Sequence, residues 1–450
     1  MRLFQALRID DGEVVAFTGA GGKTTAMFRL ADDLAEHGRT VLTTTTVKVS
    51  PALIERAPRH FSSAEANRGR VEAALDRHTH LFVTGPVDRA IDSAAPVTAG
   101  LIDELLTVPR LGALLIKADS GNRRLFKAPL GDEPTVPPAT TLVVVMANLE
   151  AIGEAIIDLN VHNAARAAEL ANVGAGQDVT ADVLARVLAH PEGGLKGVPE
   201  GARVAVFLNR VDLPRRLEIG RGIAQRLLAE PRINTVLLGT ARKPNAVAEV
   251  HGRVGAVVLA AGQSTRMGQP KLLMEWAEGG TILGAVLTRL RATPVTEIVV
   301  VTGAERERIE AVARAAAEGD PRLSFVHNPD FAEAEMGRSL QTGLKALQTD
   351  PEAALVALGD QPLMPTAVIG DLVQRWRETL APVVAPVHGD KRGHPLLLDR
   401  AVWPRVMALA ANANPRQALA GLPVENVVAP DNAILLDIDT PEDYARARGL

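Results

Sequence analysis

The chain has 450 residues, 47% of them hydrophobic and 23% charged, so it is long enough for two or three cored domains rather than one. Its formal net charge of -4 excludes broad attraction to nucleic acid or to an anionic membrane, so any phosphate binding must be local. The absence of cysteine excludes disulfides, thiolate metal sites and cysteine nucleophiles. Neither a signal peptide nor a run of about 18 apolar residues occurs, and we expect a cytoplasmic protein that acts on small molecules.

The first half alternates short apolar runs with helical patterns. A helix is predicted over Thr24–His37, and strands are predicted over Val14–Phe17, Thr40–Thr44, His80–Val83, Leu114–Ala118, Leu142–Met146, Val204–Leu208 and Thr235–Leu238. Valine-rich and leucine-rich runs of this length, separated by helices, indicate an α/β domain with a buried parallel sheet.

A glycine-rich loop lies between the first predicted strand and the first helix. It reads Gly19-Ala20-Gly21-Gly22-Lys23-Thr24, a variant of the P-loop, because Phe17 stands where the usual pattern has its first glycine. The amides of Gly19, Gly21 and Gly22 are suited to phosphate, Lys23 supplies charge and the Thr24 hydroxyl suits Mg²⁺. The structural alternative is a glycine turn that caps a helix.

Two later segments are suited to the same pocket. Asp119 follows the strand Leu114–Ala118, where a P-loop protein keeps an Mg²⁺-ordering carboxylate. Asn209 and Asp212 are spaced like the guanine-reading Asn-Lys-x-Asp, with Arg210 in place of the lysine. An aspartate after a strand also serves as a helix cap, and Asn-x-x-Asp recurs by chance. The first domain is therefore predicted to hold a nucleotide of its own.

The first half resembles the YqeC family in three segments: the loop Gly19–Thr25, the strand end Leu42–Thr46, and Ala118-Asp119-Ser120-Gly121 leading to Arg124 and Lys127. The resemblance covers residues 1 to about 240 and implies an accessory factor of selenium-dependent molybdenum hydroxylases. One departure is that Lys117-Ala118-Asp119-Ser120 stands where the family usually has Glu-Ala-Asp-Gly.

The second half begins the alternating pattern again. Its predicted strands are Val254–Ala260, Glu297–Thr302, Leu323–His327, Ala353–Leu358 and Val383–Pro386, and its predicted helices are Ile282–Ala292, Glu305–Ala317, Ser339–Leu347 and Pro365–Thr379. The preceding segment is polar, contains Lys243-Pro244-Asn245 and has no clear period. We therefore predict domains over 1–243 and 254–450, with a linker over 244–253.

A second glycine loop follows the first strand of this half. It reads Ala260-Ala261-Gly262-Gln263-Ser264-Thr265-Arg266-Met267-Gly268 and leads to Lys271. Gly262 allows the backbone to approach phosphate. Arg266 and Lys271 are two cations at set spacing, suited to neutralise the charge of a triphosphate. Nucleotide chemistry is the first hypothesis for this loop.

Two acidic segments are candidates for the same site. Asp360, in Gly359-Asp360-Gln361-Pro362, follows a predicted strand at the edge where α/β sheets bind ligands. Asp439 belongs to the run Leu436-Asp437-Ile438-Asp439-Thr440-Pro441, in which Thr440 also caps a helix. Taken alone, Gly-Asp-Gln-Pro is equally typical of a turn.

These motifs together resemble the MobA-like nucleotidyltransferases, and within them the molybdenum cofactor cytidylyltransferases, over residues 254 to 450. The branch-specific segments are Ala260-Ala261-Gly262, His327–Asp330, Gly359–Pro362, Gly393-His394-Pro395 and Asp437-Ile438-Asp439-Thr440-Pro441. The resemblance implies a Rossmann-like, GT-A type domain that transfers CMP from CTP to molybdopterin cofactor. Mg²⁺ would be held by Asp360 and Asp439, nucleotide by Ala260, Ala261, Gly262, Ser264, Arg266, Gly268, Lys271 and Ser339, and acceptor by His394. His394 has the alternative of a structural histidine.

The sequence thus predicts a P-loop-like α/β domain fused to a nucleotidyltransferase in which Arg266, Lys271 and Asp360 are catalytic. Two other functions stay open. One is a guanylyl or sugar-nucleotide transferase, because fold does not fix substrate. The other is a maturation factor that carries the cofactor to an apo molybdenum hydroxylase and uses a nucleotide as a switch. The sequence leaves undetermined the choice of CTP or GTP, the first domain's activity, the oligomeric state and the client hydroxylase.

Overall fold

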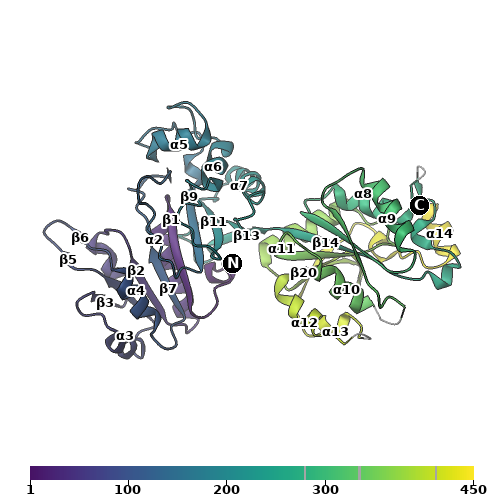
Figure 1. Ribbon diagram of the computed structural model, residues 1–450, viewed down its shortest axis with the longest axis horizontal. Coiled ribbons are helices and arrows are strands. Elements are labelled where there is room, and N and C mark those ends of the chain that lie inside the picture. The colour runs from purple at the N-terminus through teal and green to yellow at the C-terminus, as the bar shows by residue number, and fades with distance from the viewer. Residues whose placement is uncertain (278–279, 333–335, 411–412, 450) are drawn as a thin grey trace. The chain divides into compact units, whose positions relative to one another are not determined.

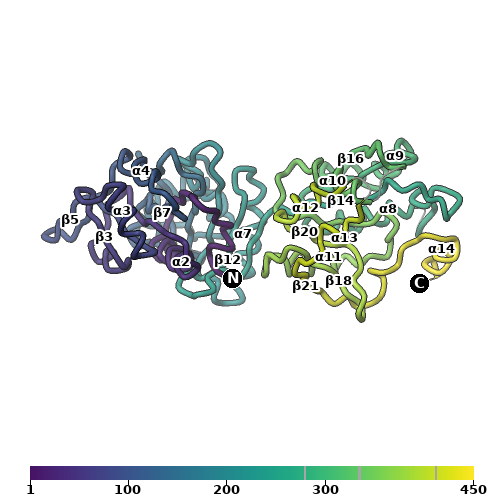
Figure 2. The backbone as a smooth tube through the Cα atoms, turned by 90° about the horizontal axis from the view of Figure 1, so that it is seen from below, coloured from purple at the N-terminus to yellow at the C-terminus, as the bar shows by residue number. Residues whose placement is uncertain are grey.

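The computed structural model describes residues 1–277, 280–332, 336–410 and 413–449. The chain folds into two compact units, Met1–His251 and Gly252–Leu450. Figures 1 and 2 show them from two directions, the first unit in purple to teal and the second in green to yellow. No helix in the described part of the chain is both long and apolar enough to cross a membrane.

A nine-stranded sheet forms the centre of the first unit, in the order β13-β12-β11-β9-β1-β7-β2-β4-β3 (Figure 1). The strands are β1 (Glu13–Gly19), β2 (Val41–Thr45), β3 (Arg59–Ser62), β4 (His80–Thr84), β7 (Ala113–Lys117), β9 (Leu142–Asn148), β11 (Arg203–Asn209), β12 (Thr235–Gly239) and β13 (Val247–Gly252). Every pairing from β12 to β3 is parallel, which confirms the predicted parallel sheet. The carboxyl ends of these strands therefore lie at one edge.

Helices cover this sheet, whose strands β1, β2, β7, β9 and β11 are buried along nearly their whole length. Helices α5 (Ala164–Ala171), α6 (Ala181–Ala189) and α7 (Pro214–Leu227) pack in one cluster with buried valines of β9 and β11. Helices α3 (Arg68–Leu75) and α4 (Ala99–Leu106) pack with residues of β1, β2 and β7. The long helix α2 (Lys23–Glu36) follows β1 directly and contacts β1, β2 and β7.

The segment 244–253, predicted to be a linker, contains strand β13, which is hydrogen-bonded to β12 in the first sheet. An irregular linker there is therefore a wrong prediction. Val247 and Val250 are buried, and the polar appearance of the segment comes from Glu249 and His251, which are buried as a hydrogen-bonded pair. The boundary between the units falls after His251.

The second unit is built on an eight-stranded mixed sheet, in the order β16-β15-β14-β17-β20-β18-β19, with β21 paired to β18. Its strands are β14 (Val254–Ala260), β15 (Glu297–Thr302), β16 (Leu323–His327), β17 (Ala353–Leu358), β18 (Val383–His388), β19 (Lys391–Arg392), β20 (Leu396–Asp399) and β21 (Val424–Val428). Strands β14 to β17 are parallel, and β20 runs antiparallel to β17. The five strands predicted in this half are all present.

Successive side chains of β14 point to opposite faces of the sheet and pack in two different hydrophobic clusters. Ala256 and Val258 belong to the cluster that includes helices α8 (Ile282–Arg291), α9 (Arg306–Ala317) and α11 (Thr366–Thr379). Val257 belongs to the other cluster, with α10 (Met336–Lys345) and α12 (Trp403–Met407). This is the two-residue period of a strand buried on both faces. Gly343 lets α10 approach β14, since a Cβ there would lie 2.3 Å from a methyl group of Val257.

Candidate functional site

The glycine loop of the second unit crosses the carboxyl end of β14. Ser264 and Gly268 both adopt positive φ, 55° and 71°, and bound a single 3₁₀ turn, Thr265–Met267. Met267 is buried, which holds the turn to the core, and Ser264 Oγ accepts a hydrogen bond from the Lys271 amide at 3.2 Å. A Cβ on Gly262 would meet no protein atom within 4 Å. The glycine is therefore not required by packing, and its bare backbone borders a cavity.

Lys271 joins the two acidic segments. Its Nζ lies 2.5 Å from Asp360 Oδ2 and 2.8 Å from Asp439 Oδ1. Arg266 reaches the other oxygen of Asp439 at 2.8 Å. Asp360 follows β17, and Asp439 precedes helix α14 (Pro441–Arg448), so residues about 170 positions apart in sequence converge beside the glycine loop. The sequence-predicted cations and carboxylates are thus brought together.

Burial and the neighbouring opposite charges shift the pKa values of Asp360 and Lys271 in opposite directions. Burial raises the pKa of Asp360, although the Lys271 ammonium opposes the shift. Burial would lower the pKa of Lys271, but Asp360 and Asp439 together hold it above its ordinary value. Asp360 Oδ1 is buried and accepts no hydrogen bond from any described residue. That oxygen is free for a ligand.

A cavity of about 330 Å³ adjoins these side chains. Its lining includes Ala260, Ala261, Gly262, Arg266, Lys271, Ser339, Asp360, Asp437 and Asp439. Ser264 and Gly268 line a separate cavity of about 290 Å³ instead. Ser339 is held in place by the Asn328 side-chain amide, which donates to its hydroxyl at 3.0 Å. Six of the eight predicted nucleotide-binding residues therefore share one cavity.

His394 lies in another cavity, of about 660 Å³, which is lined mainly by apolar side chains together with Arg392 and Arg416. Burial lowers the pKa of His394, with the charge of Asp360 opposing the shift. Met336 lines both this cavity and the one beside Asp360. A Cβ on Gly393 would lie 2.1 Å from the Ile434 carbonyl oxygen. The backbone at Gly393 therefore lies close to the backbone at Ile434, and this approach positions the neighbouring His394.

The acidic residues fit a divalent cation. Mg²⁺ commonly takes one or two carboxylates and completes its shell with water and substrate phosphate. Asp360 offers an unpartnered buried oxygen. Asp439 lines the same cavity, but its two oxygens pair with Lys271 and Arg266, so it would have to give up one of these contacts to bind the metal. Among the residues that the structure describes, no group of three or more acidic or histidine side chains is arranged to hold a metal by itself. The donor set is that of a site completed by substrate.

In the first unit, the loop after β1 leads directly into α2. Gly21 and Gly22 have φ values of 81° and 140°, and a Cβ on Gly21 would lie 2.5 Å from the Leu125 carbonyl oxygen. Lys23 is buried and its Nζ donates to the Gly19 carbonyl. A cavity of about 630 Å³ is lined by Gly21, Gly22, Lys23 and Thr24, together with Asn209.

The profile of the MobA-like NTP transferase domain matches residues 256–427, and that of the YqeC protein matches residues 15–165. The chain joins a YqeC domain to a MobA-like NTP transferase domain. It is 27% identical over 258 residues to the uncharacterized protein YqeC of Escherichia coli K12, covering 52% of this chain and 90% of that protein. It is 29% identical over 195 residues to the molybdenum cofactor cytidylyltransferase of the same organism, covering 43% of this chain and 95% of the relative.

Solved structures are also similar to part of this chain. The crystal structure of Rv0371c from Mycobacterium tuberculosis H37Rv is 25% identical, with a TM-score of 0.39, and the match covers 44% of this chain and 99% of that one.

Three residues predicted for the YqeC domain, Gly19, Asp119 and Asp212, do not line its cavity. Asp212 pairs with Lys243 Nζ at 2.9 Å, and that contact lowers the pKa of its carboxyl. Asn209 lines the cavity, but its side chain bonds to backbone: Nδ2 donates to the Gly21 carbonyl at 2.7 Å, and Oδ1 accepts from the amides of Arg210 and Ala241. Asn209 and Asp212 are therefore both engaged by neighbouring groups, and only Asn209 lines the cavity. Asn209 holds the glycine loop.

The surroundings of Asp119 also differ from those expected for an Mg²⁺-ordering carboxylate in the YqeC domain. Both carboxylate oxygens have partners: Oδ2 accepts from the Gly19 amide at 3.0 Å, and Oδ1 pairs with Lys127 Nζ at 2.5 Å. Lys117 Nζ also donates to the Asp119 carbonyl at 2.9 Å. Through its hydrogen bond to Gly19, Asp119 therefore links the end of β7 to the glycine loop.

Sequence reasoning missed several residues that line the two cavities. In the transferase domain, Asp437 lines the cavity and accepts a hydrogen bond from Gln361 Nε2 at 2.6 Å. The signal was available, since Asp437 and Asp439 flank the buried Ile438 in an alternating run. In the YqeC domain, Lys48, Arg123 and Arg242 lie on irregular segments, where no spacing marks them.

Proposed function

We propose that the transferase domain transfers CMP from CTP to the terminal phosphate of molybdopterin, with release of pyrophosphate, during maturation of molybdenum hydroxylases. The observation that carries this proposal is Lys271, held between Asp360 and Asp439 beside the cavity that the glycine loop lines. The identity to a molybdenum cofactor cytidylyltransferase along 95% of its length supports the choice of substrates.

The chemistry is an in-line displacement at phosphorus. An oxygen of the acceptor phosphate forms a bond to the α-phosphorus of CTP, the bond from that phosphorus to the bridging oxygen breaks, and pyrophosphate leaves with the electron pair. Arg266 and Lys271 offset the negative charge that grows on the leaving group. Mg²⁺, when held by Asp360 and Asp439, would neutralise phosphate charge. No covalent enzyme intermediate is required.

The cavity around His394 is suited to the acceptor. Its largely apolar lining accommodates a ring system, and Arg392 and Arg416 supply charge for a phosphate. Because Met336 lines this cavity and the nucleotide cavity, an acceptor there would lie next to the nucleotide. His394 then contacts the acceptor as a neutral ring, since burial lowers its pKa.

The proposal is tested with purified protein, Mg²⁺, molybdopterin cofactor and each α-labelled NTP in turn, with the dinucleotide product identified by mass. We expect molybdopterin cytosine dinucleotide and a larger specificity constant for CTP than for GTP. An equal or larger constant for GTP would overturn the choice of nucleotide. Absence of any dinucleotide would favour the cofactor carrier.

A further inference from the structure

Seven lysine and arginine side chains line one cavity of the YqeC domain. Its cavity of about 630 Å³ is lined by segments that follow β1, β2, β7, β9, β11 and β12, at the carboxyl edge of the sheet. This volume is within the range of about 300–1,000 Å³ typical of small-molecule sites. The amino end of α2, with the backbone of Gly21 and Gly22, forms part of the lining. A helix of this length directs its free amides toward any anion placed there.

The charge of the lining is strongly positive. Three lysines contribute, Lys23, Lys48 and Lys117, and four arginines join them: Arg123, Arg124, Arg210 and Arg242. Among the described residues that line the cavity, the one carboxylate is Glu150, and it is already paired with Arg210 at 3.5 Å and with Arg216 at 3.3 Å. So many like charges in one concavity raise its potential and attract polyanions.

Several of these cations have no opposite charge beside them. Lys48, Arg123 and Arg242 are exposed and form no ion pair with any residue that the structure describes. Lys23 is buried at the base of the glycine loop, and burial lowers its pKa to about 7, with Asp119 opposing and Lys117 and Lys127 adding to the shift. An anion in the cavity would relieve this repulsion.

A divalent metal does not fit this site. In a P-loop site, Mg²⁺ is held by the hydroxyl that follows the lysine and by an acidic residue at another strand end. Thr24 is in place, but Asp119 is buried, pairs with Lys127 and accepts from Gly19, as described above. Lys127 is further fixed by Glu133 at 2.7 Å. The carboxylate that would order Mg²⁺ is therefore engaged by a lysine.

We propose that the cavity of the YqeC domain binds a polyphosphate group without a divalent metal, with lysine and arginine side chains in the place of Mg²⁺. Val49, Leu53 and Leu125 line the same cavity and accommodate a non-ionic portion of the ligand. The ligand class is a nucleoside polyphosphate or a free polyphosphate. This inference concerns a different domain from the proposed transferase site and does not rest on it.

The test is calorimetric titration of the full chain with ATP and with inorganic pyrophosphate, each in EDTA and in Mg²⁺. We expect saturable binding in EDTA that added Mg²⁺ does not strengthen. Tighter binding of ATP than of pyrophosphate identifies a nucleotide as the source of the polyphosphate, whereas equal affinities identify the free anion. Binding only in the presence of Mg²⁺, or no binding of either probe, would overturn the proposal.

Variants locate the binding. Lys48→Ala and Arg242→Ala each remove one exposed cation from the lining, and each should weaken binding in EDTA by about tenfold, as expected for a charge-assisted hydrogen bond. Arg77→Ala is the matched control, because Arg77 is exposed but precedes β4, at the opposite edge of the sheet. It should bind as the unaltered chain does. Equal losses in all three variants would show only a general charge effect and would refute the site.

The transferase domain must be excluded as the source of the signal. Lys271→Met removes a cation from the transferase cavity, and binding in EDTA should persist in this variant. Loss of the EDTA signal in Lys271→Met would place the binding in the transferase domain and overturn the inference.

Discussion

The two oxygens of the Asp360 carboxylate have different surroundings. Oδ2 pairs with Lys271, while Oδ1 is buried without a partner among the described residues. A buried carboxylate oxygen without a hydrogen bond costs stability, which a site tolerates when the oxygen is used in function. Asp360 is accordingly the residue whose replacement should affect the proposed reaction most.

Asp360→Asn should preserve the fold, because the two side chains have nearly the same shape, and should lower the rate of pyrophosphate release by about 10²-fold or more. The rate is measured at saturating Mg²⁺ and CTP. Asp371→Asn is the control: Asp371 lies on α11 and is exposed, so turnover should match the unaltered chain. Near-normal turnover in Asp360→Asn would remove Asp360 from the site.

The convergence of Lys271 and Asp360 was predictable because each lies in a short motif of fixed spacing near the end of a strand. Lys271 and Asp360 both come from such motifs, and they meet at 2.5 Å. The cations of the YqeC domain were not predictable, because they lie on loops that the sheet gathers from distant parts of the chain. Sequence reasoning assigned Asp119 to Mg²⁺ from its position after a strand; its engagement by Lys127 depends on a tertiary contact.

His80 offers a test of burial in the YqeC domain. It is buried on β4, its Nε2 lies 3.0 Å from Thr43 Oγ1, and burial lowers its pKa to about 4. The unfolded chain binds a proton at this residue near its ordinary pKa of about 6.5, and the folded chain does not. The free energy of unfolding of this domain should therefore fall as the pH is lowered from 6.5 to 4, by about 2–3 kcal/mol.

The measurement is the titration of the His80 ring by NMR, together with thermal unfolding at each pH. In His80→Gln, the dependence of stability on pH over this window should become flatter, since the titrating group is gone. A His80 ring that titrates near 6.5 in the folded protein would contradict the prediction.

At the scale of helices and strands, the apolar runs were sufficient to predict most of the central strands of both sheets, β20 being the exception. These strands are buried on both faces, so they leave a continuous pattern in the sequence. Among the strands of the two large sheets, β3, β13, β19, β20 and β21 were not predicted. β3 and β21 are only partly buried, and β21 carries exposed residues, including Val428, which is 80% exposed. Their pairing depends on neighbours and not on their own periodicity.

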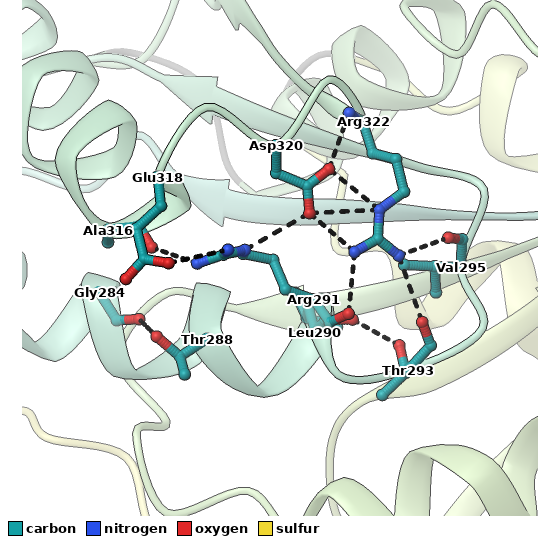
Figure 3. Close-up of polar contacts among 10 residues, drawn as sticks. All are labelled: Gly284, Thr288, Leu290, Arg291, Thr293, Val295, Ala316, Glu318, Asp320 and Arg322. Carbon is teal, nitrogen blue, oxygen red and sulfur yellow. Dashed lines mark hydrogen bonds and ion pairs between the residues drawn. The ribbon is translucent and has the colours of Figure 1, made fainter.

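A polar network fastens the start of β16 to the end of α8 (Figure 3). Asp320 pairs with Arg322 at 2.7 Å and with Arg291 at 3.4 Å. The Arg322 guanidinium also donates to the carbonyl oxygens of Arg291, Thr293 and Val295. Hydrogen bonds from Arg322 lower the pKa of Asp320 to about 2. This carboxylate therefore holds together two arginines that would otherwise repel each other.

Asp320→Asn should destabilise the transferase domain by about 1–3 kcal/mol, because it removes the charge that the two arginines share. Thermal unfolding measures the loss. For the unaltered chain, the contribution is present above pH about 4 and is lost as the pH falls through 2, since the folded pKa is the lower one.

Glu318→Gln is the matched control for this network. Glu318 also contacts Arg291, at 3.4 Å, but its side chain is 78% exposed, so water screens the pair and stability should change by less than about 0.5 kcal/mol. Equal losses in the two variants would show that burial of the Asp320 pair has no special role.

For the whole molecule, the position of the domain boundary matters to any experiment on the YqeC domain alone. The polar segment 244–253 suggested a linker, and composition could not show that its charged residues are buried in pairs. Glu249 is 3% exposed and accepts from Arg221 Nε at 3.1 Å, and His251 lies beside it. Burial of such pairs is decided by the partner helix α7, which carries Arg221.

A fragment of residues 1–251 should therefore fold, whereas a fragment of residues 1–243 should be markedly less stable. The shorter fragment lacks β13, so the edge of β12 is left unpaired. Apolar surface that Val247 and Val250 now cover becomes exposed. Arg221 also loses its ion pair with Glu249. The truncation further removes the carbonyl of Val247 that accepts from the Met1 ammonium at 2.6 Å. We expect a midpoint of thermal unfolding at least about 5 °C lower for 1–243, corresponding to a loss of about 2 kcal/mol or more.

Calorimetry of the two purified fragments at equal concentration measures the difference. The fragment of residues 1–251 carrying Glu249→Gln should fall between them, because it keeps the strand and loses the ion pair. Identical midpoints for 1–243 and 1–251 would show that β13 does not stabilise the YqeC domain. The segment would then be a linker, and the domain boundary would lie after β12.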